Sequence, residues 1–251
     1  MTDSEIFDRN LRRIRRDRAA RMVGESRLLD YVGDDLFERA SDTGQPLATA
    51  LVMNAAAHRL IERLRAQGCA VTSADPGARY AAASGGLHCD EDRYRFGTAQ
   101  YDLIVSVGLL DTVNDVPGAL VLMRHALKPG GLMLCSFAGA GSFETTRGLL
   151  RAAAPNAQYT HPMIDVRAGG DLLARAGFVR PMADVDNLRL DYADLRALAR
   201  AMRAHAATNL LVRRTPLTAA AIAALRARLS ARDGLSETLS IVTLTGWAPP
   251  S

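Results

Sequence analysis

The stretch that decides the fold runs from Tyr101 to Phe137 and reads YDLIVSVGLLDTVNDVPGALVLMRHALKPGGLMLCSF. Its beginning, Tyr101–Gly108, is an apolar and β-branched run that is typical of a buried strand. Pro117–Leu127 has the composition of a helix with proline in its first turn. The next residues, KPGG, end that helix, and Leu132–Phe137 is a second apolar run. Two buried strands joined by a helix predict a parallel sheet with helices on its faces.

The alternation of strand and helix extends on both sides of this stretch. Upstream, we expect strands over 46–53, 69–74 and 87–89 and helices over 54–67 and 78–83. Downstream, we expect helices over 142–154, 169–176, 192–206 and 218–230, one or two strands within 178–190, and a last strand over 237–247. Ser142 and Thr218 are the expected caps of two of these helices. The predicted fold class is α/β.

Two helices are expected before the first strand. The segment SEIFDRNLRRIRRDRAARM, residues 4–22, predicts an amphipathic helix that Ser4 can cap. Its apolar positions are Ile6, Phe7, Leu11, Ile14 and Met22. A second helix is expected over 26–40. We therefore divide the chain into an N-terminal helical extension, residues 1–45, and an α/β domain, residues 46–251.

Composition excludes several classes of protein. The chain has 251 residues, 48% hydrophobic and 23% charged, which is globular. No apolar run is long enough for a membrane span, so membrane insertion is not expected. Three cysteines without CxxC spacing argue against a disulfide framework and a four-cysteine zinc site. We find no targeting segment and expect a cytoplasmic protein.

The basic residues are unevenly spread. Lys128 is the only lysine, and segment 195–232 holds eight arginines and no acid, although the net charge is only +4. Such a run is usually a solvated helical surface. The alternative interpretation is a docking surface for an acidic partner. A general nucleic-acid binder is not indicated by so small a net charge.

The chain resembles class I S-adenosylmethionine-dependent methyltransferases. The resemblance rests on YDLIVS (101–106), VND (113–115) and LKPGG (127–131) in that order. Four further segments, FDRNLRRIRRDRAA (7–20), AGFVRPMADVD (176–186), MRAHAATNLL (202–211) and SIVTLTGWAP (240–249), resemble the alphaproteobacterial and mitochondrial assembly factors of respiratory complex I. That branch is related to the malonyl carrier-protein methyltransferases of biotin synthesis. The resemblance implies a Rossmann-like, seven-stranded, mostly parallel sheet with helices on both faces.

The sequence departs from this family at the glycine-rich cofactor loop. Active members have a DxGxGxG loop there, because the cofactor approaches the backbone too closely for a Cβ atom. Here the loop is VMNAAAH, residues 52–58, with no glycine and no leading aspartate. Asn54 can cap the following helix. We therefore expect S-adenosylmethionine to bind weakly or not at all.

Other parts of the implied cofactor site are better kept. Asp75 ends the second strand, where an acid accepts hydrogen bonds from ribose hydroxyls; Asp75-Pro76-Gly77 is equally an ordinary turn. Asp90 lies where family members contact adenine, with Glu91 next to it, and the run Asp90-Glu91-Asp92 also fits an exposed acidic loop. Val107, Gly108 and Leu109 would line the pocket. Together with Asn54 these are the candidate cofactor-binding residues.

No catalytic residue can be assigned. Asp111 and Thr112 stand where the family often has His and Trp, so a general base or a stacking ring is missing there. The five histidines are dispersed, and His88-Cys89-Asp90 lacks further metal ligands, so no metal is expected.

Three hypotheses remain for function. The first is a methyltransferase-like protein with a decayed methyl-donor site that binds a protein partner, by resemblance a complex I subunit, through 195–232 or the N-terminal helix. The second is an active methyltransferase with an atypical cofactor loop. The third, implied only by the family, is a protein arginine hydroxylase, for which we find no iron-ligand triad. The sequence leaves the oligomeric state open.

Overall fold

The structure, a computed structural model, describes residues 5–22, 27–155, 160–230 and 234–250. Its centre is a seven-stranded sheet in the order β3-β2-β1-β4-β5-β7-β6. The strands are β1 (Thr49–Met53), β2 (Ala70–Asp75), β3 (Leu87–His88), β4 (Tyr101–Val107), β5 (Leu127–Ala138), β6 (Val179–Tyr192) and β7 (Leu235–Trp247). All neighbours are parallel except β7, which runs antiparallel to both β5 and β6. The predicted fold class is confirmed.

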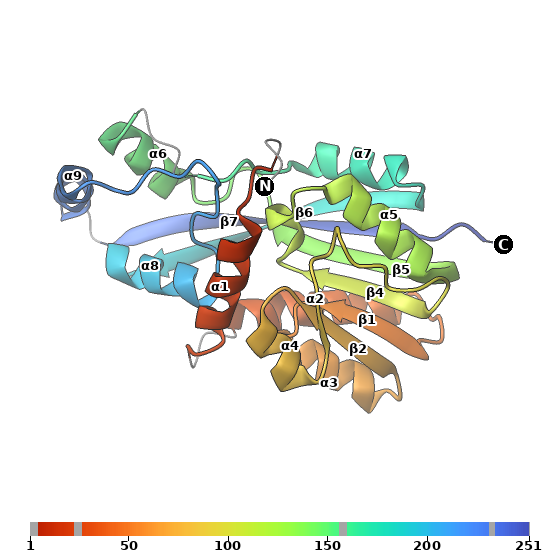
Figure 1. Ribbon diagram of the computed structural model, residues 1–251. Coiled ribbons are helices and arrows are strands. Elements are labelled where there is room, and N and C mark those ends of the chain that lie inside the picture. Colours follow the sequence, from red (N-terminus) through yellow and green to blue (C-terminus); the bar gives the residue numbers. More distant parts are fainter. Residues whose placement is uncertain (1–4, 23–26, 156–159, 231–233, 251) are drawn as a thin grey trace.

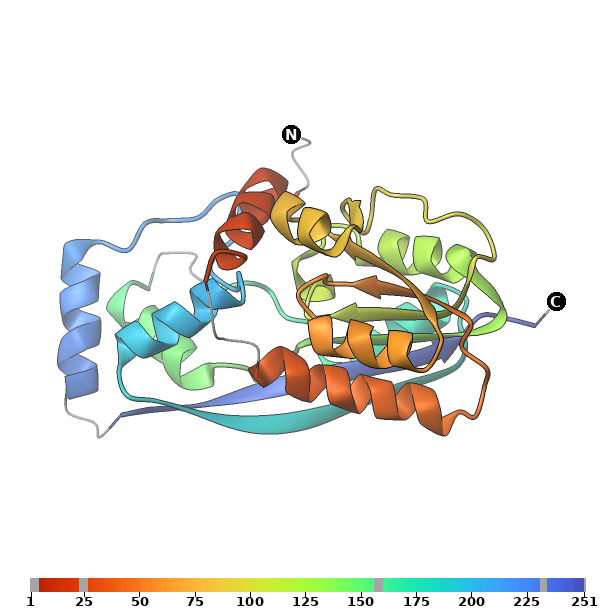
Figure 2. The ribbon, with the colours of Figure 1, turned by 90° about the horizontal axis from the view of Figure 1, so that it is seen from below.

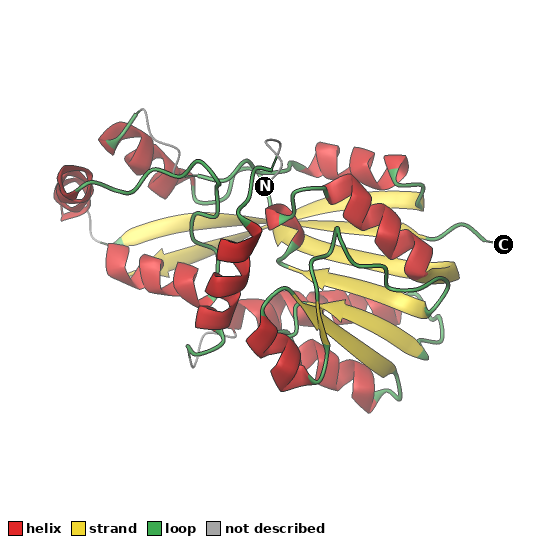
Figure 3. Ribbon diagram, in the orientation of Figure 1, coloured by secondary structure: helices red, strands yellow, loops and turns green. Residues whose placement is uncertain are grey.

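Helices cover both faces of the sheet (Figure 3). They are α1 (Arg9–Ala19), α2 (Arg27–Asp42), α3 (His58–Ala66), α4 (Ala78–Ser84), α5 (Val116–Ala126), α6 (Glu144–Ala153), α7 (Val166–Arg175), α8 (Leu195–Ala204) and α9 (Ala219–Ser230), with a 3-10 turn at Leu110–Thr112. Side chains of α2 and α3 pack on one face, and those of α5 and α7 on the other. Each face is apolar because the central strands are buried on both sides.

The last two strands form an arm that leaves the sheet. β7 pairs with β5 only from Ile241 to Trp247, whereas its pairing with β6 continues to Leu235 opposite Tyr192. In Figure 1 this two-stranded arm extends away from the sheet and carries α6, α8 and α9. The expected strands within 178–190 are therefore one long strand.

Helix ends follow the sequence in part. Thr218 accepts a hydrogen bond from the Ala221 amide, as expected of a cap. Ser142 does not cap α6, because its hydroxyl donates to the carbonyl of Ser240 and anchors the loop to β7. Asp8 caps α1, while Ser4 lies outside the described residues. The proposed boundary at residue 45 stays a prediction, since α1 and α2 both pack against elements of the α/β domain.

Candidate functional site

The candidate site lies where the parallel strands end. Asn54 follows β1, Asp75 closes β2, and Val107 closes β4, so the strand order brings the three together at one edge of the sheet. This carboxyl edge is where open α/β sheets bind ligands. Helix α1 crosses it, packing against α4 on one side and α8 on the other (Figure 1).

The loop after β1 keeps a glycine-like backbone. Asn54 has φ +94°, a region that side chains other than those of Asn and Asp rarely enter. Its side-chain nitrogen Nδ2 donates to the Val107 carbonyl at 2.7 Å, and its Oδ1 accepts from the backbone amide of Ala56 at 3.1 Å. The expectation that Asn54 caps the next helix is wrong, because the cap residue of α3 is Ala57. Asn54 instead ties the ends of β1 and β4 together.

Asp75 is fully buried and its carboxylate is saturated. Oδ1 accepts from Arg16 Nε at 3.1 Å and from the Gly77 amide at 2.7 Å. Oδ2 accepts from Arg16 Nη2 at 2.5 Å and from the Ala55 amide at 3.0 Å. A carboxylate offers about four acceptor positions, so no position is left for another donor. The same Nη2 also donates to Asn54 Oδ1 at 2.7 Å.

The acidic loop after β3 is held by the same helix. Arg12 makes a bidentate pair with Glu91, both contacts 2.7 Å, and the Glu91 side chain has no exposed surface. Three more contacts complete the set: Arg9 pairs with Asp92 through two bonds of 2.6 Å, Arg13 pairs with Asp90, and Arg12 Nη2 donates to the Leu109 carbonyl at 3.1 Å. Four arginines of one helix thus meet four acids of the strand ends.

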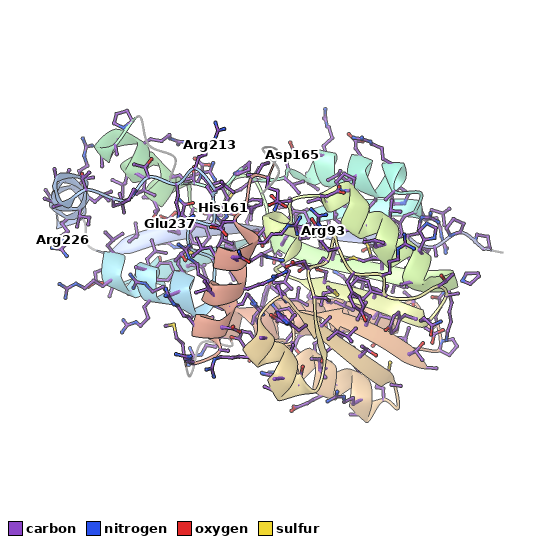
Figure 4. All side chains as sticks on the ribbon, in the orientation of Figure 1. Arg93, His161, Asp165, Arg213, Arg226 and Glu237 are labelled. Atoms are coloured by element: carbon purple, nitrogen blue, oxygen red, sulfur yellow. The ribbon has the colours of Figure 1, made fainter. Side chains whose placement is uncertain are left out.

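Local sequence explains why α1 can dock so closely. A Cβ atom on Gly77 would lie 2.6 Å from the Cβ of Arg16, so α1 can pack this closely against the loop after β2 only because residue 77 is glycine. Upstream, Phe7 is buried with Leu210 and Leu211, and its ring meets that of His161 edge to face at 5.1 Å. Figure 4 shows His161 beside this end of α1. His161 Nε2 accepts from the Leu210 amide at 2.7 Å.

The orientation of α1 differs from the sequence prediction. A helix is present as expected, but its buried face carries Arg12, Arg16 and Ala19. Ile14 is 48% exposed, as is Ile6 in the segment before the helix. The acids at the strand ends attract the arginine face more strongly than the apolar core attracts two isoleucines. This arginine face is therefore not available to a partner in this arrangement.

Burial and charge shift the pKa values of three groups around α1. Burial lowers the pKa of Arg12, but the charge and hydrogen bonds of Glu91 outweigh it, so the net pKa is raised. Burial raises the pKa of Asp92, and the bonds from Arg9 reverse this to a net lowering. Burial also raises the pKa of Asp111 to about 7. Asp111 Oδ1 is enclosed and accepts no hydrogen bond from the described residues.

A cavity of about 540 Å³ begins beside the Arg16 guanidinium. Asn54, Val107, Gly108 and Asp111 line its end at the sheet. From there it continues between α2, α8 and the β6–β7 arm along mostly apolar walls, which include Leu28, Leu29, Val32, Met202, Leu239 and Ile241. Figure 2 shows α2 and α8 on this side of the sheet.

Comparison with known proteins identifies the family of the chain. The sequence profile of a methyltransferase domain family matches residues 15–180. The chain belongs to this methyltransferase domain family. Its sheet and flanking helices have the class I methyltransferase fold: the YcgJ protein from Bacillus subtilis superposes with a TM-score of 0.58 at 14% identity over 87% of this chain and 100% of that one. A phosphoethanolamine N-methyltransferase from Haemonchus contortus, solved with S-adenosyl-L-methionine, gives 0.51 at 15% identity over 86% of this chain and 52% of that one.

Relatives of this methyltransferase-family chain fall into two groups. A malonyl-[acyl-carrier protein] O-methyltransferase from Xylella fastidiosa is 36% identical over 61% of the chain, which spans about half, 54%, of that relative. Mitochondrial arginine-hydroxylase NDUFAF5 is 25% identical in Danio rerio over 97% of the chain and 83% of the relative. The human protein is 26% identical over 96% and 76%. The predicted branch is confirmed.

The residues at the strand ends do not fit S-adenosylmethionine in this arrangement. The acid that would accept the ribose hydroxyls has its acceptor positions filled, and Arg16 stands over the loop. The side chain of Val52, at the position of the leading aspartate, is buried in the apolar core between the sheet and helices α2 and α3. Ala55 and Ala57 are buried as well. Within the part of the chain described here, no group of three His, Cys, Asp or Glu side chains could hold a metal ion, and no helix could cross a membrane.

The candidate residues divide into two sets. Asn54, Val107 and Gly108 reach the cavity wall, whereas Asp75, Asp90, Glu91 and Leu109 lie against α1. Their assignment to a cofactor stays a prediction. Sequence reasoning missed the partners of the acids, Arg9, Arg12, Arg13 and Arg16. Their spacing was the available signal, because residues at i, i+3, i+4 and i+7 share one helix face.

Proposed function

We propose that the chain is a methyltransferase-fold binding protein whose methyl-donor site has decayed and is closed by its own N-terminal helix. One observation carries the proposal: all four acceptor positions of Asp75 are used within the chain, two of them by Arg16. A cofactor ribose would have to displace a buried, charge-assisted pair to reach this acid.

The loop adds to this barrier. A cofactor entering beside Asn54 would meet Cβ atoms at 55–57 and find no carboxylate at position 52. Each missing charge-assisted hydrogen bond costs about 1.5–3 kcal/mol. A micromolar site holds only about 8 kcal/mol in total. The loss of the aspartate together with the pairing of Asp75 is therefore enough to abolish useful affinity.

Calorimetric titration with S-adenosylmethionine and S-adenosylhomocysteine tests the closed site. We expect no micromolar binding to the natural chain or to Arg16→Ala, which frees Asp75 but leaves the loop unchanged. Combining Arg16→Ala with Asn54→Gly, Ala56→Gly and His58→Gly frees Asp75 and removes three of the loop's Cβ atoms, so this variant should bind the cofactor measurably more tightly than Arg16→Ala alone. Arg65→Ala, on an exposed turn of α3, is the control for loss of an arginine. A micromolar dissociation constant for the natural chain would sink the proposal.

The alternative function is an active S-adenosylmethionine-dependent methyltransferase with an atypical loop. The backbone of Asn54, at φ +94°, favours it, because the turn keeps the shape that a glycine would give. In that case α1 would have to swing away from Asp75 when cofactor binds. Micromolar binding accompanied by a change in proteolytic cleavage within α1 would support this alternative.

For the partner, we propose a subunit of respiratory complex I, as the resemblance to the assembly-factor branch implies. The relationship to NDUFAF5, which extends over nearly the whole chain, supports this choice. We also propose a cytoplasmic location. In cells that lack this chain, complex I activity should fall, and the natural chain should restore it. Unchanged complex I activity in such cells would contradict the assembly role.

A further inference from the structure

Helix α8 carries a straight row of arginines on its outer face. Arg196, Arg200 and Arg203 are all exposed and stand at i, i+4 and i+7, so they lie on one face and form what we call the α8 stripe. The opposite face is apolar, and its Leu198 is buried. In Figure 1, α8 lies on the arm formed by β6 and β7, away from the central sheet.

The α8 stripe makes no ion pair within the described chain. None of its three arginines makes an ion pair or a hydrogen bond with another described residue. Like charges three or four residues apart on a helix repel each other. Two other arginines of the basic segment already interact within the chain: Arg213, on the loop after α8, and Arg226, on α9 (Figure 4). The three exposed guanidinium groups of the stripe are therefore free to pair with carboxylates of another molecule.

The stripe is also short and bounded. Helix α8 has ten residues, which corresponds to about 15 Å of helix. Asp191 and Asp194 stand immediately before it, and both are exposed. A long polyanion such as a nucleic acid would run into these acids. A lipid surface is disfavoured because the apolar side of α8, with Ala201 and Met202, faces the cavity and is not free to enter a bilayer.

We propose that the α8 stripe docks an acidic α-helix of a protein partner, one that carries carboxylates at i, i+4 and i+7. Two antiparallel helices with this spacing place each carboxylate opposite one guanidinium, and the planar fork of arginine suits bidentate pairing. This inference deepens the binding function proposed above and rests on it for the premise that the partner is a protein. It adds the surface and the chemistry of the partner.

The test uses a fluorescent, alanine-rich helical peptide of about 18 residues, long enough to be helical, with glutamates at i, i+4 and i+7. Binding is followed by anisotropy with the full chain. We expect Arg196→Glu/Arg200→Glu/Arg203→Glu to weaken binding about tenfold or more, with a smaller loss for the glutamine triple variant. The glutamine variant also keeps the test valid if reversal of charge harms folding. Circular dichroism checks the fold of each variant.

The matched control reverses three exposed arginines elsewhere on the surface. Arg65, Arg167 and Arg175 make no ion pair with described residues, and Arg65→Glu/Arg167→Glu/Arg175→Glu changes the net charge equally. This variant should bind the peptide within about twofold of the natural chain. The inference is overturned if both triple variants lose the same affinity, or if a peptide of equal charge with scrambled spacing binds as well.

Two further probes separate the macromolecular classes and the two proposals. Stripe-dependent binding to phosphatidylglycerol vesicles or to a DNA duplex, without binding to the peptide, overturns the choice of an acidic helix. Peptide binding is measured without S-adenosylmethionine. A micromolar affinity for that cofactor would therefore overturn the closed-site proposal and leave the peptide result unchanged. Absence of peptide binding would overturn only the docking inference.

Discussion

Helices α1 and α8 have nearly the same arginine pattern and opposite environments. Both carry arginines at i, i+4 and i+7 on one face, and both have apolar residues elsewhere on the surface. The arginine face of α1 is turned into the protein, where each arginine meets an acid of the strand ends. That of α8 is turned to solvent, where no described acid pairs with it.

The difference teaches that spacing alone does not decide which face of a helix is buried. Four acids gather at the carboxyl edge of the sheet, so the arginine face of α1 is the face that docks. Beside α8, the described residues of the β6–β7 arm offer no such group of acids, and the apolar side of the helix, with Met202, faces the mostly apolar cavity. The same pattern therefore closes one site and opens another.

The largest effect on stability is expected when one arginine is removed from each helix in turn. Arg12→Met should lower the free energy of unfolding by about 3–5 kcal/mol, because it leaves Glu91 buried without its partner. Arg200→Met should change it by about 0.5 kcal/mol or less, as for other exposed positions. Urea unfolding measures both values. Equal losses in the two variants would show that α1 is not docked as described.

The acidic edge can also be tested through Asp111, whose enclosed Oδ1 accepts no hydrogen bond from the described residues. The pKa of Asp111 is raised to about 7 by burial, above its value in the unfolded chain. The folded protein therefore holds a proton that the unfolded chain releases, and this contribution to stability is lost as pH rises from about 4 to 7.

Asp111→Asn should remove that loss. The variant and the natural chain should have similar stability at pH 4, and the variant should be more stable at pH 8, by an amount on the order of 2 kcal/mol. Thermal or urea unfolding at both pH values measures the difference, in which contributions of other acids cancel. A difference that does not change with pH would mean that Asp111 is ionised in the folded chain below pH 7.

The sequence predicted the order of strands and helices. The apolar runs within 101–137 indicate strands that are buried on both faces of the sheet, and the structure has them there. Asp75 could be placed at a strand end for the same reason. The partner of Asp75 could not be predicted, since Arg16 is 59 residues away and their contact depends on how α1 crosses the sheet.

Local rules also failed where tertiary contacts compete with them. Ser142 has the character of a helix cap, but a carbonyl of β7 lies within reach and takes its hydroxyl. Asn54 likewise looks like a cap, but it holds a positive φ and binds Val107. In both cases the partner comes from a distant strand, which no window of sequence contains.

The fit of α1 against the loop after β2 is testable by one methyl group. Gly77→Ala would place a Cβ 2.6 Å from the Cβ of Arg16, too close for either backbone to accept. We expect a loss of about 1–3 kcal/mol in unfolding free energy as α1 is pushed outward. Gly148→Ala, inside α6 and with open space around it, should instead gain up to about 1 kcal/mol. Similar effects at both positions would contradict close docking of α1.

The smallest expected effect separates stability from binding on α8. Arg200→Glu places a carboxylate between Arg196 and Arg203, which converts two repulsive pairs into attractive ones of about 0.2–0.5 kcal/mol each. The variant should therefore be slightly more stable than the natural chain in thermal unfolding, yet bind the acidic peptide less well. A surface retained only as a solvated face would show the first effect without the second. An arginine that lowers the stability of the fold and raises the affinity for the peptide is expected where the residue serves to bind a partner. If Arg200→Glu instead loses both stability and affinity, Arg200 makes a contact within the chain.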